Sequence, residues 1–216
     1  MTQHVFDEMR RTMVASQLRT TGVSDPRVVA AMGAVPRERF VPADSAAIAY
    51  ADVLVPLDGD RGLNPPMALG RLLTEAQPRA GDRALVIGAA TGYSAAVLAR
   101  LVGHVTAVEE DPALLQAART ALVGSAVEFV EAPLAQGHPV GAPYDLILID
   151  GAVEVVPDAL VAQLADGGRL AAGIVDDGVT RLAVGRRGGD GFAMTAFSDA
   201  AAAILPGFAR PRTFNF

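Results

Sequence analysis

The chain has 216 residues, of which 51% are hydrophobic and 19% are charged, so it can bury a large core and is not a disordered protein. The net charge of −6 argues against the basic surface of a nucleic-acid-binding protein. The absence of cysteine excludes disulfides, a thiol nucleophile and a cysteine metal site, and three scattered histidines give no metal-binding motif, so no metal is predicted.

The apolar segments give no sign of a membrane protein. None approaches the ~20 residues that span a bilayer, and the N-terminus lacks the apolar core of a signal peptide. We therefore expect a cytoplasmic protein with no membrane or nucleic-acid partner. The sequence leaves the oligomeric state open.

The N-terminal third is expected to contain helices followed by a loop. Residues 7–21 have helical spacing of apolar residues, and Gly22 ends that helix. Ser24 or Asp25 caps a second helix that starts at Pro26. Residues 36–42 are predicted as a turn or short extended piece, and 43–51 as a short helix. Residues 52–66 contain three prolines and two glycines, which favours a surface loop before a helix over 67–76.

The most informative stretch is residues 84–112. An apolar strand over 84–87 leads into the small-residue turn 88–92, a helix over 93–101 and a second strand over 104–108 that ends in Glu109. Glu109 follows Gly88 by 21 residues, near the spacing of about 20 at which an acid binds a ribose in nucleotide-binding βαβ units. Small residues allow close approach of a ligand to the backbone, so we predict a small-molecule site. An ordinary tight turn is the alternative.

The turn does not have the residues that hold a pyrophosphate. A dinucleotide fingerprint requires glycine at 88, 90 and 93, but this chain has Gly88, Ala90 and Tyr93, and it has no phosphate loop. A nucleoside with a non-phosphate group fits better. S-adenosylmethionine is the common ligand of that kind.

The remaining segments complete an α/β pattern. Helices are predicted over 112–123 and 159–164, and strands over 127–130, 144–149 and 169–175. Residues 180–187 and 192–198 flank a Gly-Gly-Asp-Gly turn and predict a hairpin. We therefore expect a doubly wound, mostly parallel seven-stranded sheet with a C-terminal antiparallel hairpin, a finish typical of methyltransferases. The aromatic stretch 205–216 is expected to pack against the domain.

Short blocks at matching spacing resemble the protein-L-isoaspartate O-methyltransferase family over roughly residues 8–175. They are M-V-x-x-Q-L from Met13, D-P-R-V-V-x-A-M from Asp25, V-P-R-x-x-F-V-P from Val35, P-Y-D-L-I-L-I from Pro143 and G-G-R-L from Gly167. The resemblance implies a Rossmann-like methyltransferase fold. Residues 1–66 would be an N-terminal helical extension with the substrate loop, packed on a cofactor-binding domain over 67–216. It also implies methyl transfer from S-adenosylmethionine to the carboxylate of an isoaspartyl residue in damaged proteins, which begins their repair.

This chain departs from the family pattern at several site positions. The Thr-Ile-Ser-x-Pro block is absent, and Asn64 stands where the serine would be. Val86 replaces an acid, Ala90 replaces the second glycine of the turn, and Ala132-Pro133 replaces Gly-Asp. These departures leave two alternatives open. One is a non-catalytic descendant that acts as a binding or scaffold module, and the other is a methyltransferase with a different acceptor.

The resemblance and the residue chemistry together give the candidate site residues. Asn64 offers a donor and an acceptor to the substrate, and Arg61 can pair with a carboxylate. Asp150 directly follows the strand predicted over 144–149, at the sheet edge where α/β proteins bind ligands, and is assigned to both catalysis and cofactor binding. The other expected cofactor-binding residues are Gly88, Ala89, Ala90, Thr91, Gly92, Tyr93, Glu109, Glu110, Pro133 and Leu134.

Overall fold

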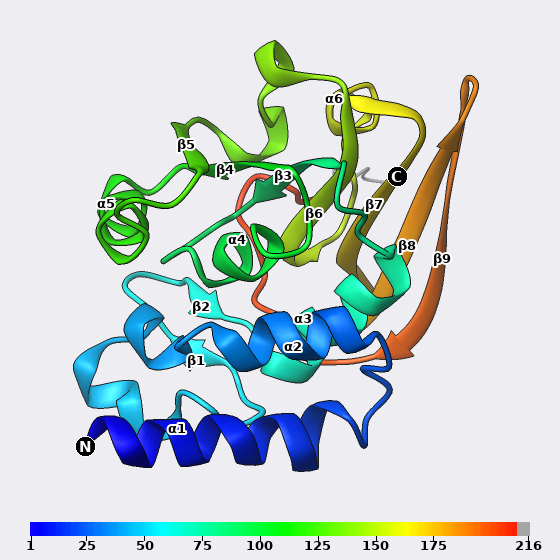
Figure 1. Ribbon diagram of the computed structural model, residues 1–216. Coiled ribbons are helices and arrows are strands. Elements are labelled where there is room, and N and C mark those ends of the chain that lie inside the picture. Colours follow the sequence, from blue (N-terminus) through cyan, green and yellow to red (C-terminus); the bar gives the residue numbers. More distant parts are fainter. Residues whose placement is uncertain (211–216) are drawn as a thin grey trace.

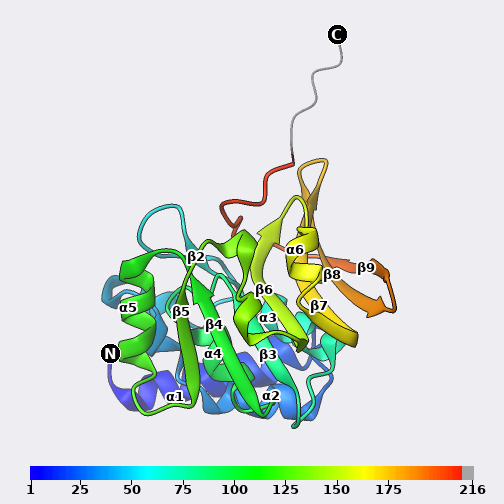
Figure 2. The same ribbon diagram turned by 90° about the horizontal axis from the view of Figure 1, so that it is seen from above.

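The computed structural model describes residues 1–210, which fold around a central seven-stranded sheet with strand order β5-β4-β3-β6-β7-β8-β9 (Figure 1). The strands of this sheet are β3 (Arg83–Ile87), β4 (His104–Glu109), β5 (Val127–Glu131), β6 (Tyr144–Val153), β7 (Leu164–Asp176), β8 (Val179–Gly188) and β9 (Gly191–Asp199). Seen from above, α5 lies beside β5 at one edge, and the β8–β9 hairpin projects at the other (Figure 2).

The strand directions confirm the predicted fold class. Strands β3 to β7 pair in parallel, whereas β8 pairs antiparallel with both β7 and β9. The order reverses between β3 and β6, the arrangement of a doubly wound sheet, and ligands bind at the carboxyl edge of such a reversal. This places the turn after β3 and the acid after β4 at the same edge.

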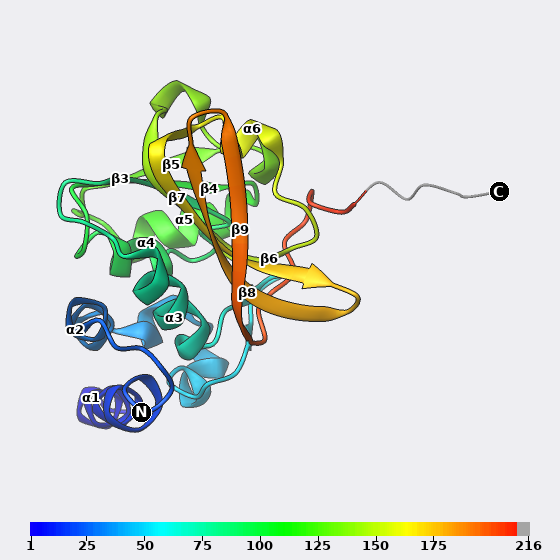
Figure 3. The same ribbon diagram turned by 90° about the vertical axis from the view of Figure 1, so that its right-hand side faces the viewer.

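Six α-helices and several tighter turns surround the sheet within residues 1–210. The helices are α1 (Gln3–Thr12), α2 (Pro26–Ala34), α3 (Pro66–Ala76), α4 (Tyr93–Leu98), α5 (Pro112–Ala121) and α6 (Asp158–Val161). The π-helix η1 spans Met13–Leu18, and the 3₁₀ turns are η2 (Arg37–Phe40), η3 (Ala43–Ile48), η4 (Leu134–Gln136) and η5 (Pro139–Gly141). Helices α3 and α4 lie nearest the sheet, with α2 beyond them and α1 outermost (Figure 3).

The central strands are buried on both faces, so their side chains divide between two cores. Ala84 and Val86 of β3 face the larger core with helices α2, α3 and α4. Leu85 and Ile87 face a smaller core, to which α6 and the C-terminal residues contribute. Strands covered on both faces read as continuous apolar runs, which is why residues 84–87 and 144–149 could be recognised as strands.

Two predicted helix starts are confirmed by their caps. The Asp25 carboxylate accepts the N–H of Arg27 at 2.8 Å, and Pro26 follows as the first residue of α2. Asp111 caps α5 in the same way, accepting the N–H groups of Ala113 and Leu114. A side chain that accepts such N–H groups satisfies donors that the first helical turn leaves free.

Elsewhere the local structure differs from the expectation. The first helix starts at Gln3 and becomes π-helical at Met13. Residues 37–40 form a 3₁₀ turn, one of the two forms expected for 36–42. The expected surface loop 52–66 contains a small hairpin of β1 (Val55–Pro56) and β2 (Gly62–Leu63), and Leu63 to Pro66 are buried. Its proline and glycine content predicted turns but carried no information on burial.

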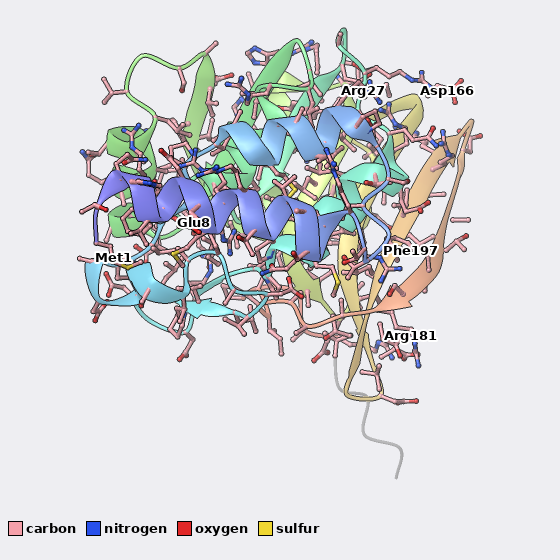
Figure 4. All side chains as sticks on the ribbon, turned by 60° about the horizontal axis from the view of Figure 1, so that its bottom comes forward. Met1, Glu8, Arg27, Asp166, Arg181 and Phe197 are labelled. Atoms are coloured by element: carbon pink, nitrogen blue, oxygen red, sulfur yellow. The ribbon has the colours of Figure 1, made fainter. Side chains whose placement is uncertain are left out.

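Helices α1 and α2 run side by side on the N-terminal side of the molecule, with Glu8 on α1 and Arg27 in the first turn of α2 (Figure 4). No helix in the described part of the chain is long and apolar enough to cross a membrane. Of the aromatic stretch 205–216, Leu205 and Phe208 are buried against the smaller core, and residues 211–216 lie outside the described residues.

Candidate active site

The turn between β3 and α4 has a strained backbone. Gly88, Ala90 and Gly92 have φ angles of 74°, 48° and 95°, all in the left-handed region. Glycine adopts this region freely, whereas alanine does so at an energetic cost. The N–H groups of Gly88 and Ala89 donate to the carbonyl oxygen of Val108 at 3.0 and 3.1 Å, which ties the turn to β4. The surrounding structure therefore holds Ala90 in a conformation that it would not prefer alone.

Glu109 ends β4, and its fully buried carboxylate is surrounded by donors. Arg61 donates from Nη1 to Oε1 at 2.5 Å and from Nη2 to Oε2 at 2.8 Å. Backbone N–H groups of Ala90, Glu110 and Asp111 donate at 2.7, 3.0 and 3.1 Å. A carboxylate has about four acceptor positions, so these donors fill it. In this conformation, a ribose diol finds no free lone pair on Glu109.

Asn64 and Asp150 come together from positions 86 residues apart. The Asn64 amide nitrogen donates to Asp150 Oδ1 at 2.8 Å, and its side-chain oxygen accepts the N–H of Ala203 at 2.7 Å. The backbone carbonyl oxygen of Asn64 accepts a hydrogen bond from Arg37 Nη2 at 2.6 Å. Both ends of the amide that we expected to bind a substrate are thus engaged within the protein.

Asp150 lies inside β6, because this strand continues to Val153 rather than ending at Ile149. The residue is 6% exposed. Burial raises the pKa of Asp150. The neighbouring Ser94 hydroxyl opposes that rise most, followed by the hydrogen bond from Asn64 and the positive charges of Arg37 and Arg61. A carboxyl in such surroundings is closer to neutral than an exposed aspartate.

Arg37 is a member of this polar cluster that the sequence reading missed. It is fully buried, donates from Nε to the Ala49 carbonyl oxygen at 2.6 Å, and stacks over the Tyr93 ring at 4.6 Å. Burial lowers its pKa, and the neighbouring Tyr93 and Asp150 oppose this. The sequence signal that could have identified Arg37 was its place in the block V-P-R-x-x-F-V-P. Its burial is unusual, because arginine is rarely buried unless it is paired.

Tyr93 packs inside the protein instead of facing an open cavity. Its ring is fully buried and meets Phe40 edge-on at 5.6 Å between centroids. Burial raises the pKa of its hydroxyl. Thr91 also points toward this region, since its hydroxyl donates to the Phe40 carbonyl oxygen at 2.6 Å.

The structure also brings together the expected residues after β4 and β5. The Glu110 carboxylate accepts the N–H of Leu134 at 3.2 Å, and Pro133 precedes the 3₁₀ turn that buries Leu134. No group of three or more histidine, aspartate or glutamate side chains suited to a metal occurs in residues 1–210.

A cavity of about 800 Å³ lies beside this cluster. Glu110, Asp111 and Arg61 line it, together with the loop at 54–62 and the C-terminal residues 202–206. The turn residues 88–92 do not line it. The cavity therefore reaches the acidic residues after β4 but stops short of the turn.

The chain resembles known proteins over most of its length. The family model for "Protein-L-isoaspartate(D-aspartate) O-methyltransferase (PCMT)" matches residues 9–201. A protein named protein-L-isoaspartate O-methyltransferase from Methylorubrum populi is 40% identical over 189 residues, covering 86% of this chain and 89% of that protein. A protein of the same name from Methanoregula boonei is 41% identical over 172 residues, covering 78% and 79%.

Solved structures agree with this result. One named protein-L-isoaspartate O-methyltransferase superposes with a TM-score of 0.80 at 26% identity, and the alignment covers 92% of this chain and 66% of the solved chain, just under two thirds. A second, described as such an enzyme from Plasmodium falciparum in complex with S-adenosyl-L-homocysteine, has a TM-score of 0.76 and covers 93% and 97%. At 18% identity, this second likeness supports the fold.

Proposed function

Because the chain belongs to the protein-L-isoaspartate O-methyltransferase family, we propose that it transfers a methyl group from S-adenosylmethionine to the carboxylate of an isoaspartyl residue in a damaged protein. The observation that carries this proposal is the family match over residues 9–201, which includes the 88–92 turn, Glu109 and the loop containing Asn64. The sheet reversal between β3 and β6 supports the proposal, because doubly wound sheets bind ligands at the carboxyl edge of such a reversal and the 88–92 turn follows β3.

The reaction requires little acid–base chemistry from the protein. A carboxylate with an ordinary pKa of about 4 is already ionised at pH 7, so it is a ready acceptor. Holding the acceptor in line with the methyl group then supplies most of the acceleration. Arg61 and Asn64 are the candidates for that positioning, because a guanidinium pairs with carboxylates and an amide can donate to them.

In the structure described here, the groups expected to bind the methyl donor and the acceptor contact one another. Arg61 and three backbone N–H groups saturate Glu109, and Asn64 is bonded to Asp150 and Ala203. These internal contacts favour the second candidate function, a non-catalytic descendant that uses the fold for binding. An acceptor other than an isoaspartyl residue is a further alternative.

The first experiment is calorimetric titration of the full chain with S-adenosylmethionine and S-adenosylhomocysteine. We expect binding, and we expect Glu109→Ala to weaken it by about tenfold to a hundredfold, because a charged hydrogen bond contributes about 1.5–3 kcal/mol. Glu128→Ala is the matched control, since this exposed β5 residue lies away from the turn. Thermal melts verify that each variant is folded.

The second experiment identifies the acceptor. An isoaspartyl peptide incubated with S-adenosylmethionine should acquire a base-labile methyl ester, whereas the matching aspartyl peptide should not. Cofactor binding without ester formation would reject the isoaspartyl acceptor and leave a different acceptor or a binding role. A cytoplasmic location stays a prediction.

A further inference from the structure

The C-terminal strap, which we define as residues 202–208, lies along the end of β6. Ala152 of β6 donates its N–H to the Ala203 carbonyl oxygen at 2.7 Å and accepts the N–H of Leu205 at 2.9 Å. Ile204 between them forms a parallel bridge with Ala152. The chain thus returns from the β8–β9 hairpin to the carboxyl edge of the sheet.

Leu205 fills the space directly above the turn after β3. A Cβ atom placed on Gly88 would lie 2.8 Å from Leu205 Cδ1 and 3.4 Å from Arg61 Nη2. A Cβ atom on Gly151 would lie 2.6 Å from Leu205 Cγ. The side chain itself is only 3% exposed. The small residues of the turn permit a close approach to the backbone, and in this structure Leu205 and Arg61 make that approach.

Buried and exposed residues alternate along the strap. Ala203 and Leu205 are buried, whereas Ile204 is 65% exposed and Pro206 is exposed. Phe208 is buried in the smaller core beyond Gly207, whose φ of 84° lies in the left-handed region open to glycine. The exposed residues Pro206 and Gly207 separate the two buried anchors, so displacement of Leu205 does not require Phe208 to leave the smaller core.

We propose that the strap is an autoinhibitory element, with Leu205 and Arg61 occupying the part of the cofactor site that adjoins the Gly88 turn. This inference rests on the proposed function. Binding of S-adenosylmethionine then requires Leu205 to leave Gly88 and Arg61 to release Glu109. The adjacent cavity of about 800 Å³, with Glu110 and Asp111 in its wall, is the part of the site that remains open.

Affinity for S-adenosylhomocysteine tests whether the strap competes with the cofactor. Leu205→Ala removes the side chain above Gly88, so the open form gains population and the affinity should rise by about tenfold, since apparent affinity scales with the competent fraction. Ala203→Pro removes the N–H bonded to Asn64 and should have the same effect without changing the wall around the turn. Val140→Ala is the control, because Val140 is 89% exposed and does not line the cavity, and it should bind like the unmodified protein.

A single introduced thiol tests the displacement directly, because the chain contains no cysteine. Ala203→Cys places a thiol on the buried side of the strap while Leu205 stays in place, and saturating S-adenosylhomocysteine should accelerate its alkylation at least severalfold if the strap leaves. Ala171→Cys, buried in the core strand β7, reports global unfolding and should not change.

The outcomes separate the two proposals. Binding of unchanged affinity in Leu205→Ala and Ala203→Pro, with no acceleration or with protection of the thiol, overturns the strap and leaves the methyltransferase assignment standing. If neither the unmodified protein nor the folded variants with a released strap bind S-adenosylhomocysteine, both the strap proposal and the methyltransferase assignment are overturned. Tighter binding together with faster alkylation supports both.

Discussion

Glu109 and Asp150 are two buried carboxylates at one sheet edge, and their partners differ. Glu109 accepts bidentate hydrogen bonds from the Arg61 guanidinium and further hydrogen bonds from three backbone N–H groups. Asp150 receives the Asn64 amide. Charge-assisted bonds of the first kind are roughly twice as strong as those between neutral groups. Burial raises the pKa of Asp150, because the groups around it do not fully compensate for its removal from water.

The Asp150 carboxyl predicts a pH-dependent stability. The pKa of Asp150 in the folded state lies above the ordinary value, so the folded state binds this proton more tightly than the unfolded state does. The resulting contribution to folding stability is fully present at pH values below the ordinary aspartate pKa, and it is lost as the pH rises through the folded pKa. Asp150→Asn keeps an acceptor for Asn64 but cannot ionise. We expect the variant to gain stability over the unmodified protein as the pH rises above about 4.

Urea denaturation over a series of pH values measures this difference. Asp145→Asn provides the comparison, because Asp145 precedes it in the same strand and is only half-buried. A stability difference for Asp150→Asn that stays constant from acid to neutral pH would contradict the prediction.

The packing of α3 shows how tertiary contact overrides helix preference. Gly70 lies in the middle of α3, where glycine costs roughly 0.5–1 kcal/mol relative to alanine. A Cβ atom there would lie 2.8 Å from Val23 Cγ2 and 3.2 Å from Met32 Sδ of α2. Glycine at this position therefore lets α3 approach α2 and its preceding loop closely.

Gly70→Ala should destabilise the protein by about 1–2 kcal/mol, because overpacking costs about 1–3 kcal/mol and exceeds the gain in helix preference. Chemical denaturation gives the free energy of unfolding. Gly81→Ala is the control, since a Cβ atom at Gly81 meets nothing within 4 Å, and its effect should be small. A gain in stability for Gly70→Ala would show that α2 and α3 can separate without cost.

The whole molecule covers the two faces of its sheet unequally. Helices α2, α3 and α4 cover one face, whereas α6, short turns and the strap cover the other. Leu205 and Phe208 consequently complete a core that the helices leave partly open. The same residues that close the smaller core also close the cofactor edge, so stability and ligand access are coupled in this fold.

Native-state hydrogen exchange should reveal this asymmetry. The amides of Ala203 and Leu205 should exchange through local opening at a lower free energy than those of Leu85 and Ile147 in the central strands, which open only with global unfolding. Nuclear magnetic resonance of the ligand-free protein measures each amide. Equal protection of the strap and the central strands would mean that the strap opens only when the whole domain unfolds.

Local patterns in the sequence were sufficient for the framework. Asp25 with Pro26 marked one helix start, helical spacing located the helix over 112–123, and the Gly-Gly-Asp-Gly turn marked the hairpin. Apolar runs located the strands, and their alternation with helices predicted the sheet. These signals work because caps, turns and side-chain periodicity depend on residues within a few positions of one another.

The sequence by itself therefore determined the fold, the family and the place of Glu109 at the end of β4. Only the tertiary structure decided what Glu109 and Asn64 contact. Arg61 lies 48 residues before Glu109, and Ala203 lies 139 residues after Asn64. Leu205 reaches Gly88 only because the chain returns from the β8–β9 hairpin to the carboxyl edge of the sheet, beside the end of β6. Contacts over such separations follow from the packing of the complete chain, and no local pattern encodes them.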